Sequence, residues 1–467
     1  MRDAGLAALY ARVAEYAAHR RAGDDERRHA PDLSYEAQVK RFALDLSREG
    51  APAEQVINEL IDLAEPGLAA MTGPRFFGWV IGGSNPVGVA ADWLTSAWGQ
   101  NTANHFATPS ASAAEAAAAA ALLELMDLPR ESSVGFVTGA TMAGFTCLAA
   151  ARSEMLRRAG WDLESEGMAG SPPITVILGA EAHSTIFAGL KYLGFGERRL
   201  MTVDVDANGA MLADAAVAAI HSVSGPMIAI AQAGHINSGS FDPFREIAAA
   251  CRAKNAWLHI DGAFGLWARA TETHRRLGDG IELADSWSVD GHKWLQTPYD
   301  CAYAIVRHRE AHVRAMQIAA SYLPSAGSGV RVPADYVPEL SRRARGFATW
   351  AMIRLLGRRG IAEMVSQHCA LARRIARILS AAGAEILNDV VLNQVAVHFG
   401  SDAETQAVIA KVQADGVCFV GGAQWRGRQV MRVSVTNENT TEADVDHSAA
   451  AMLAAWKAVR GGATSAG

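Results

Sequence analysis

The sequence predicts an α/β fold, in which a mostly parallel central sheet is flanked by helices and followed by a smaller C-terminal α+β domain. Three observations carry this prediction. Short β-rich runs alternate with segments of helical periodicity through the middle of the chain, the first 70 residues show helical periodicity alone, and the last 110 residues mix both patterns. We therefore expect an N-terminal helical segment (1–75), a large α/β domain (76–310), a loop and linker (311–350) and a small domain (351–467).

The N-terminal segment predicts three helices. Its helical periodicity is interrupted by the charged stretch 20–28 and by Pro31 and Pro52, and the third helix is expected to end near Pro66. Because so thin a layer of helices has little core of its own, we expect it to pack on the body of the protein or on another subunit.

Five apolar runs predict the strands of the central sheet, because each is short and rich in β-forming residues. These runs are Val134–Thr138, Ile174–Leu178, Met227–Ala231, Trp257–Asp261 and Ser286–Asp290. Helical segments between several of them favour parallel pairing. A further strand at Cys301–Arg307 follows after a short connection, so we expect it to be antiparallel.

The polar stretches 162–173 and 321–340 predict loops, and the second is long enough to suggest a functional role. The apolar patterns beyond them predict two helices, three strands and a closing helix. In chain order these are Phe347–Gly357, Ile361–Ala382, Val390–Phe399, Val417–Val420, Gln429–Val435 and Glu442–Val459.

The composition indicates a soluble, cytoplasmic protein. Half of the 467 residues are hydrophobic and 20% are charged, as in ordinary globular proteins. The net charge of −6 argues against nucleic acid or an anionic membrane as a partner. The five cysteines are odd in number and scattered in apolar runs, which is typical of reduced core thiols rather than metal ligands. The N-terminus lacks a signal-peptide pattern, and the alanine-rich run Ala111–Met126 is too short to span a bilayer, so it predicts a buried helix.

Lys293 and Asp261 carry the first chemical signal, because each stands at the end of a predicted strand. A pyridoxal-phosphate (PLP) enzyme needs such a pair: the lysine holds the cofactor as a Schiff base, and the carboxylate keeps the pyridine nitrogen protonated. The chain has six lysines against 37 arginines, and the nearest rival, Lys191, lies in a predicted helix. Taken alone, Asp261 is explained equally well as a helix N-cap, and Lys293 as a surface lysine.

Gly139, Ala140 and Thr141 predict an anion-binding turn. They follow a predicted strand and open a helix, so small side chains let backbone N–H groups approach an anion at the positive helix end, and Thr141 adds a hydroxyl. The pattern is neither a P-loop nor a Rossmann fingerprint. A tight strand-to-helix turn without a ligand explains it equally well.

Three histidines and an asparagine follow predicted strand ends. His183 can stack on a planar cofactor and contact a substrate carboxylate, although a lone histidine is more often structural. His235 and Asn237 can border the same site or belong to a plain turn, and His292 can donate to phosphate or be polar loop filler. Together these residues favour a binding site, because ligands of open α/β sheets collect at strand ends.

Five segments match a known family. They are Thr138-Gly-Ala-Thr141, Ala182-His-Ser184, Gly239-Ser-Phe-Asp-Pro243, His259-Ile-Asp-Gly-Ala263, and His292-Lys-Trp-Leu295 with Tyr299-Asp-Cys301. In these segments the chain resembles the group II PLP-dependent amino acid decarboxylases, relatives of the aromatic amino acid and glutamate decarboxylases, from about residue 74 to the C-terminus. The resemblance implies the fold of type I aspartate aminotransferases, with PLP as the cofactor.

The resemblance also implies roles for single residues. Lys293 would form the Schiff base, Asp261 would face the pyridine nitrogen and His183 would stack on the ring. Other members of the set would hold the phosphate (Ala140, Thr141 and His292) or pack under the ring (Ala263). The residues expected to bind the cofactor are Gly139, Ala140, Thr141, His183, His235, Asn237, Asp261, Ala263, Asp290, His292 and Lys293.

Tyr322 provides a further match. The segment Ser321-Tyr-Leu323 resembles the mobile catalytic loop of the family, whose tyrosine protonates the carbanionic quinonoid after CO₂ leaves. Where relatives carry phenylalanine instead, an aldehyde-forming oxidative decarboxylation results, so Tyr322 favours simple decarboxylation. The basic run Leu340–Arg345 resembles the segment that follows this loop.

The expected substrate pocket departs from that of the aromatic decarboxylases. Trp79 and Gly82 would form one wall, and Asn101 and His105 the other, where aromatic decarboxylases are bulkier and more apolar. The resemblance therefore leaves the amino acid substrate open.

The resemblance also implies a homodimer with active sites at the interface, in which the N-terminal helices embrace the partner and Tyr322 can serve the neighbouring site.

The expected reaction is decarboxylation of an L-amino acid to the amine and CO₂, through an internal aldimine on Lys293 and protonation by Tyr322. Three alternatives keep the cofactor: oxidative decarboxylation–deamination, transamination and another lyase reaction. A non-catalytic relative of the same fold is the least favoured alternative. We expect no metal.

Overall fold

The computed structural model describes residues 4–44, 49–318 and 330–464, and it divides into two compact units. The large unit comprises Val80–Arg373 and Asn388–Val395. The small unit comprises Met1–Trp79, Arg374–Leu387 and Ala396–Gly467. The division into four segments predicted from the sequence stays a prediction.

The large unit contains a seven-stranded sheet with the order β1-β7-β6-β5-β4-β2-β3. Neighbours from β6 through β5, β4 and β2 to β3 pair in parallel, whereas β7 pairs antiparallel with both β1 and β6. The strands are β1 (Ser133–Val137), β2 (Thr175–Gly179), β3 (Leu200–Val203), β4 (Met227–Gln232), β5 (Trp257–Asp261), β6 (Ser286–Asp290) and β7 (Ala302–Val306). The predicted mostly parallel sheet is confirmed, as is the antiparallel strand after Lys293; β3 was not predicted.

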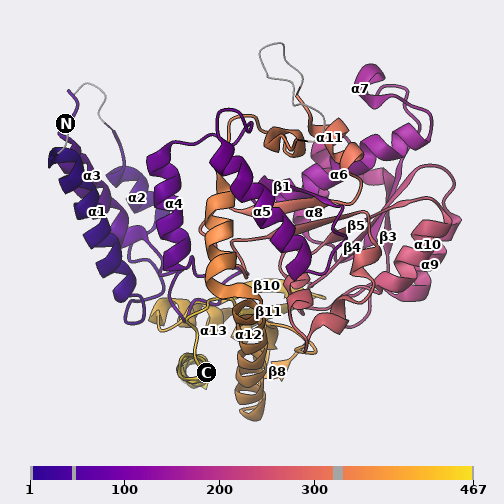
Figure 1. Cartoon of the computed structure of the whole chain (residues 1–467). Helices are drawn as coiled ribbons and strands as arrows, with labels where there is room; N and C mark the ends of the chain where they lie inside the picture. Colours follow the sequence, from indigo (N-terminus) through magenta and orange to yellow (C-terminus); the bar gives the residue numbers. More distant parts are fainter. Residues whose placement is uncertain (1–3, 45–48, 319–329, 465–467) are drawn as a thin grey trace. The chain divides into compact units, whose positions relative to one another are not determined.

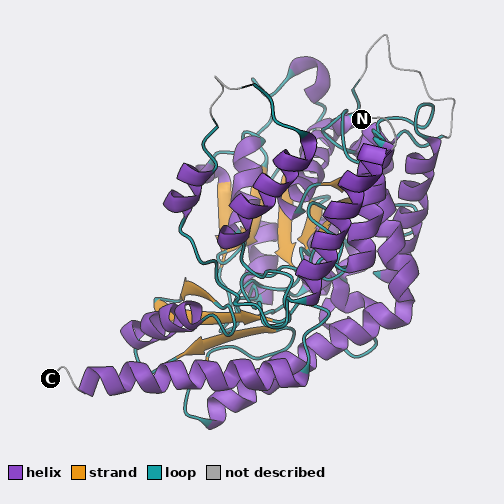
Figure 2. Ribbon diagram, turned by 90° about the vertical axis from the view of Figure 1, so that its left-hand side faces the viewer, coloured by secondary structure: helices purple, strands orange, loops and turns teal. Residues whose placement is uncertain are grey.

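The sheet separates two layers of core. Met227, Ala229 and Ala231 of β4 pack in one hydrophobic cluster with residues of α5, α9 and α10. Ile228 and Ile230, which point to the other face of the strand, pack in a second cluster with residues of α6, α8 and α11. Helices therefore cover both faces, as Figure 2 shows for the strands of this unit.

The helices of the large unit begin and end at recognisable signals. In α4, Asn85 Oδ1 accepts the Val87 N–H at 2.7 Å, Pro86 occupies the first turn and Gly99 ends the helix with φ of 61°. The helices, labelled in Figure 1, are α4 (Pro86–Trp98), α5 (Pro109–Leu125), α6 (Ala140–Arg158), α7 (Leu163–Glu166), α8 (Ser184–Tyr192), α9 (Ala213–Ser222), α10 (Phe244–Ala253), α11 (Arg309–Met316) and α12 (Arg345–Ala381). Helix α12 is kinked at Gly357, with φ of 59°, so it comprises the two helices that the sequence predicts there.

Short 3₁₀ helices complete the helical structure. They are η1 (Glu65–Gly67), η2 (Glu197–Arg199), η3 (Gly265–Ala270), η4 (Arg275–Gly278), η5 (Ile281–Leu283) and η6 (Pro333–Tyr336). Two of them lie in stretches discussed above: η1 ends the N-terminal helical layer, and η6 lies in the loop predicted at 321–340.

The small unit combines helices with a four-stranded sheet of order β10-β11-β9-β8. Its strands are β8 (Glu385–Ile386), β9 (Gln394–His398, whose last three residues belong to this unit), β10 (Gly421–Trp425) and β11 (Arg428–Ser434). Its helices are α1 (Ala4–Ala22), α2 (Tyr35–Arg41), α3 (Ala53–Ala64), α13 (Asp402–Asp415) and α14 (Glu442–Thr464), together with the last turns of α12. The predicted N-terminal helices and closing helix are present.

One strand prediction in this unit is wrong. Val417–Val420 is not a strand, because Phe419 pairs with the N-terminal residues 75–77 instead. Its ring stacks on Phe76 at a centroid distance of 4.7 Å, and its carbonyl accepts the Phe77 N–H at 2.8 Å. The apolar character of this run reflects that contact, and the strand begins only at Gly421.

All five cysteines are buried and free, as expected for core thiols. Among the residues that the structure describes, no helix is both long enough and apolar enough to cross a membrane.

Candidate active site

The residues singled out in the sequence gather at the carboxyl ends of parallel strands. Asp261 is the last residue of β5, and Asp290 is the last residue of β6, three positions before Lys293. His183 follows β2, and His235 follows β4. Because these strands are neighbours in the sheet, their ends lie along one edge.

Asp261 is a buried carboxylate. Its Oδ1 accepts the Ala263 N–H at 3.2 Å and lies 3.4 Å from Ser288 Oγ. Burial raises its pKa, whereas His183 and Lys293 lower the pKa by favouring the charged form. A cationic group placed beside this carboxylate would therefore offset the cost of burying its charge.

Lys293 lies on the loop after β6, and its ammonium is held by a carboxylate. Lys293 Nζ is 2.8 Å from Asp290 Oδ2 and 5.8 Å from the centroid of the Phe264 ring. The backbone of this loop also contacts Gly82, whose N–H donates to the His292 carbonyl at 3.0 Å. A Cβ added at Gly82 would lie 2.3 Å from the Lys293 carbonyl oxygen, so only glycine fits there.

The predicted anion-binding turn opens α6, a helix of 19 residues with Gly139 as its N-cap. The Ala140 N–H donates to Asp290 Oδ1 at 2.6 Å, which places a carboxylate at this helix end. The Thr141 side chain is exposed beside it. The turn therefore has the small residues and the helix N-terminus that anion binding requires, and its first N–H already binds a carboxylate.

His292 is oriented by its neighbours. Its ring lies 4.3 Å from the Tyr299 ring, and its Nδ1 accepts the Cys301 N–H at 3.4 Å. Burial lowers its pKa, while Asp290 raises the pKa. In the neutral ring the proton therefore belongs to Nε2, 3.6 Å from Asp290 Oδ1, where it can be donated to an anion.

His183 is the N-cap of α8. Its Nδ1 accepts the Thr185 N–H at 3.3 Å and lies 2.7 Å from Thr185 Oγ1. These contacts fix the plane of the ring and leave the Nε2 side to carry the proton. The sequence predicted that His183 follows a strand end but not that it caps a helix, and its stacking on the cofactor stays a prediction.

His235 and Asn237 lie in a buried turn after β4. His235 Nε2 is 3.2 Å from Glu181 Oε2, and its Nδ1 accepts the Asn237 N–H at 3.3 Å. The Asn237 side-chain oxygen is buried and has no hydrogen-bond partner within the described residues. The turn is thus internally bonded, as the simpler interpretation required, and yet it keeps one buried acceptor unsatisfied.

The expected substrate residues are more dispersed. Trp79 belongs to the small unit, is 52% exposed and packs against Phe76 and Phe419. Tyr322 lies outside the described residues, so its role stays a prediction. The His105 ring lies 4.3 Å from the Phe106 ring.

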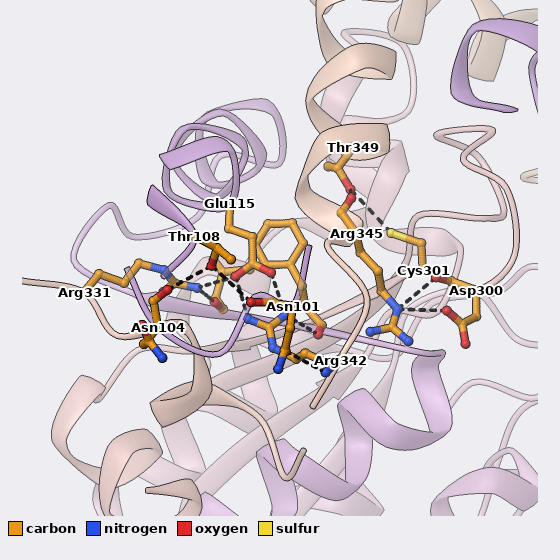
Figure 3. Close-up of polar contacts among 12 residues, drawn as sticks. Asn101, Asn104, Thr108, Glu115, Asp300, Cys301, Arg331, Arg342, Arg345 and Thr349 are labelled. Carbon is orange, nitrogen blue, oxygen red and sulfur yellow. Dashed lines mark hydrogen bonds and ion pairs between the residues drawn. The ribbon is translucent and has the colours of Figure 1, made fainter. Parts of the chain in front are cut away.

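Asn101 is engaged with the segment after the predicted catalytic loop, as Figure 3 shows. Its Oδ1 accepts the Arg342 N–H at 3.1 Å, and its carbonyl accepts the Thr108 hydroxyl at 3.1 Å. The Arg342 guanidinium in turn forms a bidentate pair with Glu115, at 2.5 and 2.9 Å. Asn101 therefore fixes the backbone of this segment, a role that its residue type alone does not reveal.

Two carboxylates near the site were missed. Asp242 accepts the N–H groups of Met211 and Gln232 at 2.7 and 2.6 Å, and burial raises its pKa to about 7. It stands in the recognised segment Gly239–Pro243, which could have drawn attention to it. Glu181 stands two residues before His183 and pairs with His235.

The arrangement fits PLP. Burial disfavours the charge of Asp261, so a pyridinium nitrogen beside it would stabilise the carboxylate, and the N-terminus of α6 is suited to a phosphate. Asn237 keeps an unsatisfied acceptor, and Lys293 supplies an amine at the same sheet edge. Fold and site together define a PLP-dependent enzyme.

Comparisons with known proteins agree. Residues 36–399 match the family model described as the pyridoxal-dependent decarboxylase conserved domain. The chain is 28% identical to aromatic-L-amino-acid decarboxylase of Bacillus atrophaeus, over 66% of this chain and 64% of that enzyme. It is 30% identical to L-2,4-diaminobutyrate decarboxylase of Rhizobium meliloti (strain 1021), over 77% of this chain and 73% of that enzyme. The structure of Oryza sativa TDC with PLP and tryptamine shares the fold, with a TM-score of 0.90 at 20% identity and 98% of both chains covered.

The chain therefore belongs to the pyridoxal-dependent decarboxylase family. Its cofactor is PLP, and its class is that of the PLP-dependent carboxy-lyases.

Proposed function

We propose that this protein decarboxylates an L-amino acid to the corresponding amine and CO₂, with Lys293 as the residue that binds PLP covalently. The observation that carries the proposal is the placement of the buried Asp261 at the end of β5 and of Lys293 just after β6, the parallel neighbour of β5. Bound PLP supplies a ring that accepts the electron pair released when CO₂ leaves.

The other residues of the site orient the cofactor. Asp261 would hold the pyridine nitrogen in its protonated form, and His183, fixed by Thr185, would cover the ring. Ala140, Thr141 and His292 Nε2 would hold the phosphate, and the Ala140 N–H would exchange its bond to Asp290 Oδ1 for one to the phosphate. His235 and Asn237, in the turn after β4, would border the ring.

Tyr322 is the proposed proton donor to the substrate α-carbon. A phenol matches this step because it is protonated at neutral pH, with an ordinary pKa near 10, and can be recharged from water. A competing oxidative reaction would consume oxygen and release peroxide together with CO₂, which distinguishes it from simple decarboxylation.

The first test removes the amine. In Lys293→Ala we expect the absorbance of lysine-bound cofactor and the turnover to be lost, because the variant lacks the amine that would bind the cofactor covalently. Lys191→Ala, which removes an exposed lysine of α8, is the matched control and should behave as wild type. Retention of both the absorbance and the turnover in Lys293→Ala would overturn the proposal.

The substrate is identified by screening. The names of the relatives make aromatic amino acids and L-2,4-diaminobutyrate the first candidates. Purified enzyme is assayed with each L-amino acid for CO₂, amine and peroxide. CO₂ and amine in equal amounts support simple decarboxylation, whereas peroxide and an aldehyde would replace it with the oxidative reaction.

A homodimer is part of the proposal. Large apolar side chains are exposed on α4 and on the first half of α12, whose Phe347 packs against Trp98 at a ring distance of 5.0 Å. The exposed residues are Trp93, Leu94, Trp98, Trp350 and Leu355, each between 42% and 50% exposed. A patch of this kind is typical of an interface.

A further inference from the structure

Gln296 joins the loop that carries Lys293 to the segment 82–85, whose first residue, Gly82, the sequence assigns to the substrate pocket. We propose that Gln296 is a positioning residue whose buried side-chain amide fixes the backbone of Lys293 against this segment. The inference rests on the proposed role of Lys293, and it adds a residue that takes no part in the chemistry itself.

Four hydrogen bonds connect the two stretches of chain or brace the loop. Gln296 Oε1 accepts the Gly83 N–H at 2.7 Å, and Gln296 Nε2 donates to the Lys293 carbonyl at 3.0 Å. The Gln296 carbonyl accepts the Asn85 N–H at 2.9 Å, and the Gly82 N–H donates to the His292 carbonyl at 3.0 Å. The amide of Gln296 thus bridges a donor on one stretch and an acceptor on the other.

Burial makes these contacts hard to replace. The Gln296 side chain is fully buried, so an unpaired Gly83 N–H would not regain a partner from water. Glutamate keeps the acceptor but has no donor for the Lys293 carbonyl, and asparagine is one methylene too short to span both groups. Glutamine is the residue type whose length and chemistry satisfy both ends.

The backbone of Gln296 supports the same conclusion. Its φ of 58° lies in the left-handed region, which non-glycine residues adopt rarely. A strained conformation persists only where surrounding contacts determine it, and here the hydrogen bonds on both sides do so. The strain is located three residues after the functional lysine.

The close approach of Gly82 transmits the constraint. A Cβ added at Gly82 would lie 2.3 and 2.4 Å from the carbonyl oxygens of Lys293 and His292, so the backbone of segment 82–85 directly contacts the backbone of the lysine loop. A shift of segment 82–85 therefore shifts the origin of the lysine side chain. The position of Lys293 Nζ, which contacts Asp290 and Phe264, therefore depends on where the Lys293 backbone is held.

The test uses the holoenzyme and Gln296→Met, which keeps the shape of the side chain and removes both hydrogen bonds. We expect kcat to fall by about 10- to 100-fold, because misplacement of a reacting group by about 1 Å has this effect. KM should stay within about threefold of wild type, because substrate contacts are retained. The absorbance spectrum of lysine-bound PLP should change, since the geometry of that link is altered.

Two further variants make the test decisive. Gln413→Met removes one side-chain bond to a backbone carbonyl, that of Val420 at 2.8 Å in the small unit, and should leave kcat and the spectrum unchanged. Gln296→Asn suits a left-handed backbone but is too short, so it should show the same defects as Gln296→Met if the latter does not fold.

The outcomes separate the two proposals. If Lys293→Ala loses the cofactor absorbance while both Gln296 variants keep wild-type kcat and spectrum, the positioning role is wrong and the proposed function stands. If Lys293→Ala keeps the absorbance and turnover, the proposed function itself fails. A fall in kcat with unchanged KM and an altered spectrum, absent from Gln413→Met, supports the positioning role.

Discussion

At the scale of single residues, burial determines the charge state of the titratable groups. Burial raises the pKa of Asp261, so a cationic partner would stabilise its charged form. Burial lowers the pKa of His292, which favours a neutral ring that can donate a hydrogen bond. The same effect acts on histidines to which no role in the reaction is assigned. Burial lowers the pKa of His259 and of His312 to about 3, and that of His29 to about 4.

His312 allows the consequence for stability to be measured. Burial and, to a lesser extent, Arg331 lower its pKa from 6.5 to about 3. Because the folded protein favours the neutral ring, the stability that His312 contributes is present above pH 6.5 and is lost as the pH falls toward 3. At pH 5 the loss is about 2 kcal/mol.

In His312→Asn this pH dependence should disappear. An amide can still bond to Ser133 Oγ, which lies 2.9 Å from His312 Nδ1, and it does not titrate. Urea unfolding of both proteins at pH 7 and pH 5 measures the difference: wild type should lose about 2 kcal/mol more than the variant. Equal losses would show that His312 does not titrate as its burial implies.

At the scale of elements, α5 is attached to the segment that follows the predicted catalytic loop. Glu115 and Arg342 form a fully buried bidentate pair, and Arg331 lies 3.6 Å from the same carboxylate (Figure 3). The Arg342 N–H is held by Asn101, so the pair also fixes the start of the second expected pocket wall. Breaking a buried pair leaves an uncompensated charge.

Glu115→Gln should therefore destabilise the protein by about 3–5 kcal/mol, because Arg342 would stay buried without its counter-ion. Glu124→Gln on the same helix is the matched control. Glu124 is exposed and pairs with Arg358 at 2.8 Å, so its loss should change the free energy of unfolding by less than about 1 kcal/mol. Urea titrations compare the two variants, and similar effects at both positions would contradict the distinction between buried and exposed pairs.

How much the sequence predicts depends on the range of the interactions. The strands β1, β2 and β4 to β7 were located to within about two residues, because continuous apolar runs between helical segments are local signals. Asp261, Lys293, His183 and the turn at Gly139 were singled out because each stands at or soon after the end of such a run. β3 escaped detection, since Met201 and Thr202 are exposed on this edge strand.

Long-range contacts were not predictable from local pattern. Gln296 acts through Gly83, 213 positions earlier, and Glu115 acts through Arg342, 227 positions later. Each of these residues is unremarkable among its sequence neighbours. A long-range contact also explains the misassigned strand at Val417–Val420. Phe419 stacks on Phe76, so its apolar character reflects that contact rather than a strand.

At the scale of the whole molecule, the apolar patch on α4 and α12 predicts how the chain assembles. Wild type should sediment as a dimer. Trp98→Glu places a charge where Trp98 packs on Phe347 beside the proposed interface, so it should shift the protein toward monomers. Tyr192→Glu, at a side chain that is 68% exposed on α8, is the control and should stay dimeric. A wild-type protein that sediments as a monomer would contradict the proposal.

His183 has a consequence for how variants of this enzyme are interpreted. Its ring is both the proposed cover of the cofactor and the cap of α8, so one substitution changes two properties of the protein at once. An alanine at this position removes a cap worth about 1 kcal/mol as well as the ring, and lost activity cannot then be assigned to either. Asparagine or serine keeps a capping oxygen and removes only the aromatic face. Comparing alanine with asparagine or serine at this position therefore separates the effect on folding from the effect on catalysis.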